Sequence, residues 1–211
     1  MSIFKQQAQF LTSSPDLNHL PEADMPEVAF AGRSNCGKSS LLNAVMGVKH
    51  LARTSNTPGR TKLLNFFTLG NRLMMVDLPG YGFARASRAN RTQWQENWHG
   101  YIHRRIALRH VFVLIDSRRG IMENDQEIMA GLNSAAASYS IVLTKADKLP
   151  KVLVEETQQK IQEVLKNHPA AWSEVLACSA KKRRGITALR QEILVNSGLV
   201  VRAEAEVGAG E

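Results

Sequence analysis

The sequence has only two cysteines, Cys36 and Cys178, and no run of about 20 apolar residues. Neither cysteine has neighbours at metal-ligand spacing, so a zinc motif and a disulfide framework are both excluded. No charged start followed by an apolar run stands near Met1, as a secretion signal requires. We therefore expect a soluble cytoplasmic protein that does not span a membrane.

Acidic residues are scarce relative to basic ones. The chain has 19 Asp and Glu against 27 Lys and Arg, a formal net charge of +8 at pH 7. The basic residues gather at 49–62, 85–91, 104–109, 118–119 and 181–184. Such clusters suit a nucleic-acid partner, and they equally suit a solvated surface beside one bound polyphosphate.

The length of 211 residues suits one domain that buries roughly 70% of its unfolded surface. Residues 1–24 contain Pro15 and Pro21 and are interpreted as an N-terminal extension outside the sheet. Residues 25–198 are predicted to form the domain. The short acidic segment 199–211 is predicted to be a disordered C-terminal tail.

Apolar runs alternate with helical stretches, a pattern typical of an α/β domain. It predicts a six-stranded mixed sheet, mostly parallel with one antiparallel strand and with helices on both faces. Strands are expected at 28–31, 63–69, 72–76, 110–115, 140–143 and 174–177. Gly70-Asn71 predicts a hairpin turn. Helices are expected at 38–46, 91–108, 122–137, 151–167 and 186–197.

The segment G-R-S-N-C-G-K-S follows the first predicted strand and matches the spacing of a phosphate-binding P-loop. Backbone amides of such a loop wrap a polyphosphate at a helix N-terminus. Lys38 is expected to bridge the β and γ oxygens, and Ser39 to bind Mg²⁺ directly. The predicted phosphate-binding residues are Gly32, Arg33, Ser34, Asn35, Cys36, Gly37, Lys38, Ser39 and Ser40.

A second motif, Asp77-Leu78-Pro79-Gly80, directly follows the apolar run 73–76. Loops after parallel strands form the ligand crevice of an α/β sheet. We expect Asp77 to hold Mg²⁺ through a water molecule. The Gly80 N–H can reach the γ-phosphate, because a residue without a Cβ lets the backbone approach closely.

A third motif, Thr144-Lys145-Ala146-Asp147, follows the run 141–143. One carboxylate accepts two parallel hydrogen bonds from the N1–H and the 2-amino group of guanine, a pair that adenine lacks. The Lys145 stem is expected to lie over the base, and a backbone N–H of Cys178-Ser179-Ala180 to meet guanine O6. Taken alone, Asp147 could instead be an ordinary helix cap.

Residues 25–190 resemble the EngB family of small bacterial GTPases of the translation-factor class. The matching stretches are Gly32 to Ser40, Thr57-Pro58-Gly59-Arg60-Thr61, Asp77-Leu78-Pro79-Gly80-Tyr81-Gly82, Leu143 to Lys148 and Ser179-Ala180-Lys181. The resemblance implies that Thr61, which follows Gly59 and Arg60, closes on Mg²⁺ when GTP is bound. It thereby implies catalytic roles for Lys38, Thr61 and Gly80.

Tyr81 stands where Ras-type enzymes place the glutamine that orients water, so slow hydrolysis is expected. GTPases of similar sequence use K⁺ at an asparagine of the P-loop. Stimulation by K⁺ at Asn35 is thus a hypothesis, and the alternative is that Asn35 only stabilises the loop.

Two positions depart from the usual pattern. Thr144 replaces an asparagine, which predicts a weaker anchor to the P-loop. Cys36 is interpreted as a space-filling residue, although a thiolate would be favoured at a helix N-terminus. The aromatic residues Trp94, Trp98 and Tyr101 recur at helical spacing and are expected to pack on the sheet rather than stack on bases.

The resemblance implies a monomeric GTP/GDP switch that acts on the large ribosomal subunit and its rRNA during assembly, and that is needed for normal cell division and septation. The alternative is a GTP-dependent binding module that acts directly on cell-division proteins. An ATP-using phosphotransferase is disfavoured by Asp147.

Overall fold

The computed structural model describes residues 3–52, 63–82 and 88–200, and only the backbone at residues 88–91 and 93. Gly59, Arg60 and Thr61 lie outside the described residues, as does the predicted tail from residue 201 onward. Within the described part of the chain, no helix has the length and apolar character needed to cross a membrane.

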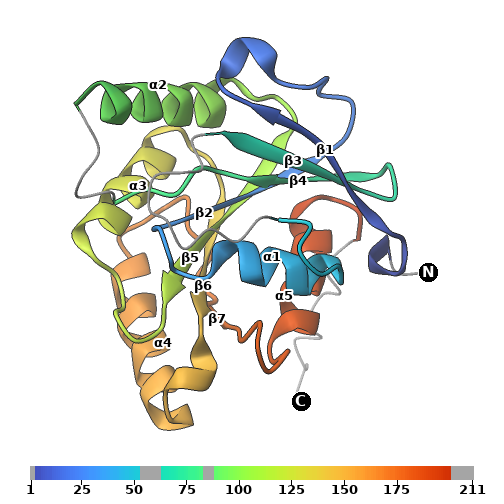
Figure 1. Ribbon diagram of the computed structural model, residues 1–211. Coiled ribbons are helices and arrows are strands. Elements are labelled where there is room, and N and C mark those ends of the chain that lie inside the picture. The colour runs from blue at the N-terminus through green and yellow to red at the C-terminus, as the bar shows by residue number, and fades with distance from the viewer. Residues whose placement is uncertain (1–2, 53–62, 83–87, 201–211) are drawn as a thin grey trace, which may run out of the picture.

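One mixed sheet forms the centre of the molecule, with the strand order β1-β3-β4-β2-β5-β6-β7 (Figure 1). Strand β3 is antiparallel to both of its neighbours, β1 and β4, and the remaining pairs are parallel. The strands are β1 (Ala8–Ser14), β2 (Glu27–Gly32), β3 (Leu64–Leu69), β4 (Leu73–Asp77), β5 (Leu108–Asp116), β6 (Tyr139–Thr144) and β7 (Leu176–Ala177).

The sheet has seven strands rather than the predicted six, because the N-terminal segment adds β1 to its edge. Ala8 pairs with Leu69 at one end of this ladder, and the register shifts between Phe10 and Thr12. The placement of residues 1–24 outside the sheet was therefore wrong. Phe10 and Leu11 are adjacent and are 50% and 47% exposed, so the segment lacks the alternation that marks a half-buried strand.

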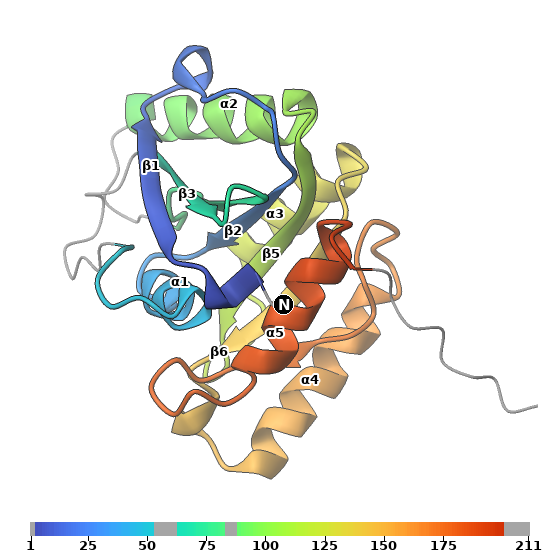
Figure 2. The same cartoon turned by 90° about the vertical axis from the view of Figure 1, so that its right-hand side faces the viewer.

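Helices cover both faces of the sheet, as predicted (Figures 1 and 2). Helices α1 (Lys38–Met46) and α5 (Ile186–Asn196) contribute to one buried cluster of hydrophobic side chains. Helices α2 (Arg88–Arg104), α3 (Glu123–Ser134) and α4 (Lys151–Leu165) contribute to the other. Three short 3₁₀ helices complete the described elements: η1 (Ile3–Lys5), η2 (Leu17–His19) and η3 (Ala146–Lys148).

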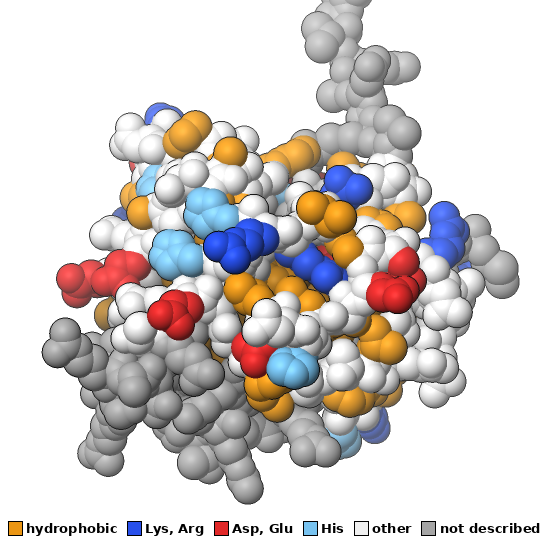
Figure 3. Space-filling view, turned by 90° about the horizontal axis from the view of Figure 1, so that it is seen from above, with side chains coloured by type: hydrophobic (Ala, Val, Ile, Leu, Met, Phe, Trp, Pro, Cys, Tyr) orange, Lys and Arg blue, Asp and Glu red, His pale blue; other side chains and the backbone are white. Residues whose placement is uncertain are grey.

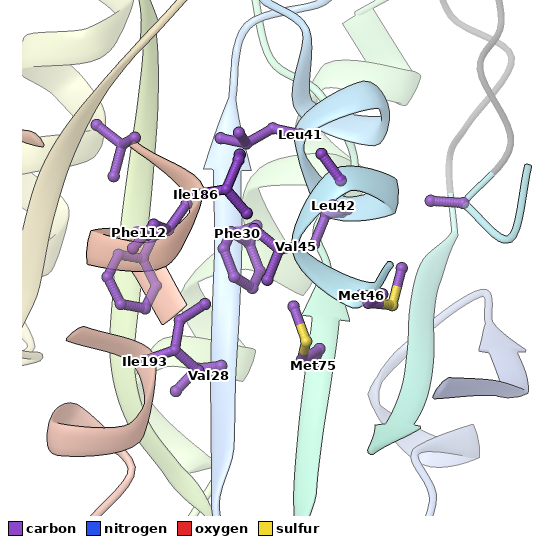
Figure 4. Close-up of a cluster of buried hydrophobic side chains, with 14 of the residues drawn as sticks. Val28, Phe30, Leu41, Leu42, Val45, Met46, Met75, Phe112, Ile186 and Ile193 are labelled. Atoms are coloured by element: carbon purple, nitrogen blue, oxygen red, sulfur yellow. The ribbon is translucent and has the colours of Figure 1, made fainter. Parts of the chain in front are cut away.

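Strand β2 is buried on both faces, which explains its apolar run from Val28 to Ala31. Val28 and Phe30 belong to the cluster beneath α1 and α5, where Phe30 stacks on Phe112 of β5 (Figure 4). Ala29 and Ala31 face the opposite cluster. Each fully buried large apolar side chain stabilises the fold by about 1.5–3 kcal/mol, so this packing fixes the strand end that leads into the P-loop.

Helix α1 begins at Lys38 and ends at Met46, as predicted, and Gly47 caps it with a φ of 75°. Helix α2 ends four residues earlier than predicted, and β5 begins two residues earlier. A turn closed by Leu108 N–H bonding Arg105 O separates them. Trp98 and Tyr101 of α2 are buried against the sheet, which confirms the packing interpretation.

Candidate functional site

The P-loop connects β2 to α1 through a backbone that few residue types adopt. Asn35 and Gly37 have φ angles of 64° and 101°, in the left-handed region. A Cβ at position 32 would lie 2.7 Å from Cys36 Sγ and 3.0 Å from the Leu114 carbonyl oxygen, so the loop packs closely on β5. The first amides of α1 lack partners within the helix, which suits them to bind an anion.

Lys38 and Asp77 meet at this loop. Strands β2 and β4 are parallel neighbours with Phe30 opposite Asp77, so Asp77 ends its strand beside the P-loop. The Lys38 ammonium forms an ion pair with Asp77 Oδ1, and the two side chains are only 9% and 4% exposed. The structure therefore brings together the lysine and the carboxylate that the sequence places 39 residues apart.

Gly80 lies against the P-loop, where a side chain would be crowded. A Cβ on Gly80 would be 3.0 Å from Ser34 Oγ and 3.3 Å from Ser34 N. Two backbone hydrogen bonds hold the neighbouring residue: Ser34 N–H donates to Tyr81 O at 3.1 Å, and Tyr81 N–H donates to Gly32 O at 3.3 Å. The Gly80 backbone therefore lies close to the P-loop, and its contact with a γ-phosphate stays a prediction.

The Tyr81 side chain is buried and points toward α3. Its hydroxyl donates to Asp125 Oδ1 at 2.8 Å, while Asp125 Oδ2 accepts the Met122 N–H at 2.9 Å at the start of α3. Burial and the neighbouring carboxylate both raise the pKa of Tyr81. The phenol is therefore neutral and engaged elsewhere, so it is not oriented to activate water at the phosphates.

The third motif contacts the P-loop from β6. The Thr144 hydroxyl donates to the Cys36 carbonyl, so the anchor expected from asparagine is made by threonine. The Lys145 ammonium donates to the Asn35 carbonyl at 2.6 Å. A Cβ on Gly37 would lie 3.3 Å from Lys145 Cε, which shows that the lysine stem crosses the loop.

A second loop holds Asp147. The Ser179 hydroxyl donates to Asp147 Oδ1 at 2.6 Å, and this bond lowers the pKa of Asp147. The Ala146 N–H donates to the Cys178 carbonyl at 3.1 Å, which joins the two loops along their backbones. An ionised, oriented carboxylate with backbone amides beside it is the arrangement that reads the guanine edge.

Cys36 is buried beneath the loop. Burial raises the pKa of its thiol to about 11, so the group is protonated at neutral pH. This supports the space-filling interpretation over that of a reactive thiolate.

The residues near Lys38 can supply oxygen ligands to Mg²⁺. Ser39 follows Lys38 in α1, and the Asp77 carboxylate lies on Lys38. Hydroxyl and carboxylate oxygens, completed by phosphate oxygens, are ligands that Mg²⁺ prefers. Over residues 3–52, 63–82 and 88–200, no group of three or more His, Cys, Asp or Glu could hold a metal without the nucleotide. Thr61, the third predicted ligand, lies outside the described residues.

Asp116 also lies at this edge of the sheet, and the sequence analysis missed it. It ends β5, just as Asp77 ends β4, so the strand-end rule could have identified it. Its carboxylate lies 3.0 Å from the Lys145 ammonium. Burial alone would raise its pKa, but hydrogen bonds from Arg118 and Lys145 lower that pKa to about 2. Asp116 lines a pocket of about 240 Å³ with Asn35, Lys145 and Arg118.

Comparison with known proteins identifies the family. Residues 27–145 match the family described as "50S ribosome-binding GTPase". A probable GTP-binding protein EngB of Ruegeria sp. strain TM1040 is 47% identical over 191 residues, covering 90% of this chain and 88% of the relative. The corresponding Rhodospirillum rubrum protein is 48% identical over 196 residues, covering 90% and 85%.

The chain is a GTPase of the EngB family. Its fold also matches solved structures. A crystal structure of a probable GTP-binding protein engB aligns with a TM-score of 0.67 and 22% identity, over 82% of this chain and 100% of that one. Era in complex with MgGDPNP and a segment of 16S ribosomal RNA aligns with a TM-score of 0.62 and 24% identity, over 81% and 56%. At these identities the likeness concerns the fold alone.

Proposed function

We propose that this EngB-family GTPase is a cytoplasmic, monomeric switch that hydrolyses GTP slowly and acts in assembly of the large ribosomal subunit. The observation that carries the nucleotide part is that two further motifs meet the P-loop and that a neighbouring loop orients Asp147 of the third motif. Lys38 pairs with Asp77, Lys145 bonds Asn35, and Ser179 fixes Asp147. The family description supports the ribosomal part.

The P-loop amides and Lys38 would hold the phosphates, since both present positive charge at the start of α1. Ser39 and Thr61, with Asp77 through a water molecule, would hold Mg²⁺. When bound, that ion neutralises charge that develops on the phosphates. Catalysis in this scheme is electrostatic, because the Tyr81 hydroxyl is bonded to Asp125 and the positive charges around the phosphates would stabilise the transition state.

Guanine selectivity would come from Asp147. Its carboxylate is fixed by Ser179 and can accept the two parallel donors of guanine, while the Lys145 stem lies over the base. An amide at Cys178, Ser179 or Ala180 would meet O6. Adenine has no such pair of parallel donors on that edge, so ATP should bind this site poorly.

Gly80 and Thr61 would sense the γ-phosphate. Gly80 packs on Ser34, which places its backbone beside the loop that would hold the phosphates. Loss of the γ-phosphate would release both segments. The Asn35 side chain is exposed at the bend of the loop, where K⁺ could supply the charge of an arginine finger.

A basic loop beside the guanine-binding segment is the described surface best suited to rRNA. Residues 181–184 are Lys-Lys-Arg-Arg, all exposed, and Lys182 N–H donates to Ser179 Oγ at 3.0 Å. By contrast, the face over α2 intermixes basic, acidic, histidine and apolar side chains (Figure 3). Phosphate contacts through the 181–184 loop would make subunit binding strongly dependent on salt.

The test measures nucleotide and subunit binding in one preparation. Wild type and Asp147→Asn would be titrated with GTP, GDP and ATP analogues, and then sedimented with large ribosomal subunits in each nucleotide state. Guanine-selective binding, with subunit binding favoured by the GTP analogue, is expected. Guanine binding without subunit binding would favour direct action on cell-division proteins, and equal ATP binding would refute the guanine site.

The proposed role of the 181–184 loop in subunit binding is tested with a pair of charge-removing double variants. Lys182→Ala/Arg183→Ala should weaken subunit binding and reduce its salt dependence without altering GDP affinity, because both side chains are exposed. Substituting Lys151 and Lys160 of α4 instead provides a matched loss of two exposed positive charges away from the loop. Equal losses in both double variants would show that only net charge matters.

A further inference from the structure

We propose that Asp116 is a positioning residue that holds Lys145 against the P-loop and thereby prolongs the residence time of the bound guanine nucleotide. The inference rests on the proposed role of Lys145 and Asp147 in guanine binding. Asp116 is not part of the P-loop or of the other two motifs, and its carboxylate meets the third motif at the Lys145 ammonium.

The fold places Asp116 beside the third motif. Strands β5 and β6 are parallel, with Asp116 opposite Thr144, and Ser117 N–H donates to Thr144 O at 3.0 Å. The Asp116 side chain is only 7% exposed. Its carboxylate therefore lies at a fixed distance from the segment that carries Lys145.

Arg118 fixes the orientation of this carboxylate. Its Nε donates to Asp116 Oδ1 at 2.9 Å and its Nη2 to Oδ2 at 2.6 Å. The Arg118 backbone N–H also donates to Oδ1, at 3.1 Å. The two-point contact of a guanidinium with a carboxylate restricts rotation about the Asp116 side chain. The oxygen that faces Lys145 is thus held in place before nucleotide binds.

Lys145 is bound at two points through the same ammonium. It lies 3.0 Å from Asp116 Oδ2 and donates to the Asn35 carbonyl at 2.6 Å. A lysine stem has several rotatable bonds and loses conformational entropy when it is ordered. Without Asp116 the ammonium would keep one partner, so the stem that covers the base would be less often in place.

Removing the Asp116 carboxylate should affect the dissociation of GDP and GTP equally. Lys145 meets the loop at Asn35 and Gly37, on the side of the proposed guanine site, whereas Gly80, the proposed γ-phosphate sensor, packs on Ser34. Removing Asp116 should therefore speed the dissociation of both nucleotides equally. The rate of the chemical step at saturating GTP should change much less.

A second reading is that Asp116 only shapes the turn that follows β5. The Arg119 and Gly120 N–H groups donate to the Asp116 backbone carbonyl at 2.9 and 3.2 Å, and any residue at position 116 keeps these bonds. The bonds to Arg118 are lost when the carboxylate is removed. Arg118→Ala therefore serves as the matched control, because it removes these side-chain bonds to Asp116 and leaves Asp116 beside Lys145.

The experiment is a double-mutant cycle on nucleotide dissociation. Fluorescent GDP would be chased with unlabelled GDP from wild type, Asp116→Ala, Lys145→Met and the double variant. We expect dissociation about tenfold faster in Asp116→Ala and no further acceleration when Lys145 is already Met. Asp116→Asn, which keeps an acceptor, should fall between wild type and Asp116→Ala, and Arg118→Ala should change the rate less than Asp116→Ala.

Two results would overturn the inference. One is a wild-type dissociation rate in Asp116→Ala, and the other is the same acceleration by Asp116→Ala in the Lys145→Met background. Thermal unfolding of each variant verifies that the compared proteins are folded. Asp147→Asn, measured alongside, separates the two proposals. If Asp147→Asn keeps guanine selectivity, the proposed guanine site is refuted. If Asp147→Asn loses selectivity while Asp116→Ala releases GDP at the wild-type rate, only the role of Asp116 is refuted.

Discussion

Lys38 forms a nearly buried ion pair with Asp77 across the loop where phosphate and metal are proposed to bind. Two charges withdrawn from water in this way stabilise the fold only while each retains a partner. A nucleotide with Mg²⁺ offers partners of matching sign, phosphate for Lys38 and the cation for Asp77. The charges of the site are thus balanced both within the protein alone and in the proposed complex.

Removing one member of this pair should destabilise the protein. Lys38→Met is expected to lower the free energy of unfolding by about 3 kcal/mol, because it leaves the Asp77 carboxylate buried without its ion-pair partner. Lys38→Met/Asp77→Asn should recover much of that loss, while neither variant should hydrolyse GTP. Urea unfolding and phosphate release measure the two effects. If the double variant lost as much unfolding free energy as Lys38→Met and Asp77→Asn lose in sum, the coupling would be contradicted.

The Thr144 hydroxyl should be needed for tight nucleotide binding. Thr144→Val keeps the shape but removes the donor to Cys36 O, which leaves a buried carbonyl short of a partner and loosens the P-loop. We expect GDP affinity to fall about tenfold. Thr144→Asn, which restores a donor, should remain closer to wild type. Calorimetric titration measures the GDP affinity of each protein. Equal GDP affinities of Thr144→Val and wild type would show that this hydrogen bond does not contribute to nucleotide binding.

Sequence predicted the parts of the site that follow buried strands. Asp77 and Thr144 end two such strands, and the parallel register brings both to the P-loop as expected. Asp116 follows the same rule but belongs to no motif with a known spacing, so it went unnoticed. Strand β1 was missed for another reason: its apolar residues Phe10 and Leu11 are both exposed at the sheet edge and carry no burial pattern.

A buried charge cluster at the start of β2 should contribute strongly to the stability of the fold. Glu27 begins β2 and is fully buried, where it accepts hydrogen bonds from Arg105 and from the Tyr101 hydroxyl. Arg105→Ala should cost about 3–5 kcal/mol of unfolding free energy, because it leaves a buried carboxylate without its countercharge. Tyr101→Phe should cost about 1 kcal/mol. Chemical denaturation measures whether Arg105→Ala lowers the unfolding free energy more than Tyr101→Phe does. Equal losses in the two variants would contradict this prediction.

His110 should make stability depend on pH. It lies buried between the Ser138 and Ser140 hydroxyls and against the rings of Phe112 and Trp172. Burial lowers its pKa from 6.5 to about 3, so the unfolded chain binds a proton more readily than the folded one. Stability from this group is therefore complete above pH 6.5 and is lost as pH falls toward 3, by about 1.4 kcal/mol per unit.

The measurement compares wild type with His110→Gln. Between pH 7 and pH 5 the wild-type unfolding free energy should fall by about 2 kcal/mol more than that of the variant. The difference between the two proteins removes the contribution of carboxylates, which titrate in both. Parallel pH profiles would show that His110 does not titrate on unfolding.

The Tyr81 hydroxyl should contribute to stability but not to hydrolysis. The hydroxyl is buried and donates to Asp125, so it does not orient the attacking water in this arrangement. Tyr81→Phe should therefore keep the single-turnover rate of GTP hydrolysis within about threefold while losing about 1 kcal/mol of unfolding free energy. Asp125→Asn, which keeps an acceptor for the phenol, is the matched control. A hundredfold loss of rate in Tyr81→Phe alone would mean that the hydroxyl leaves Asp125 during turnover and acts at the phosphates.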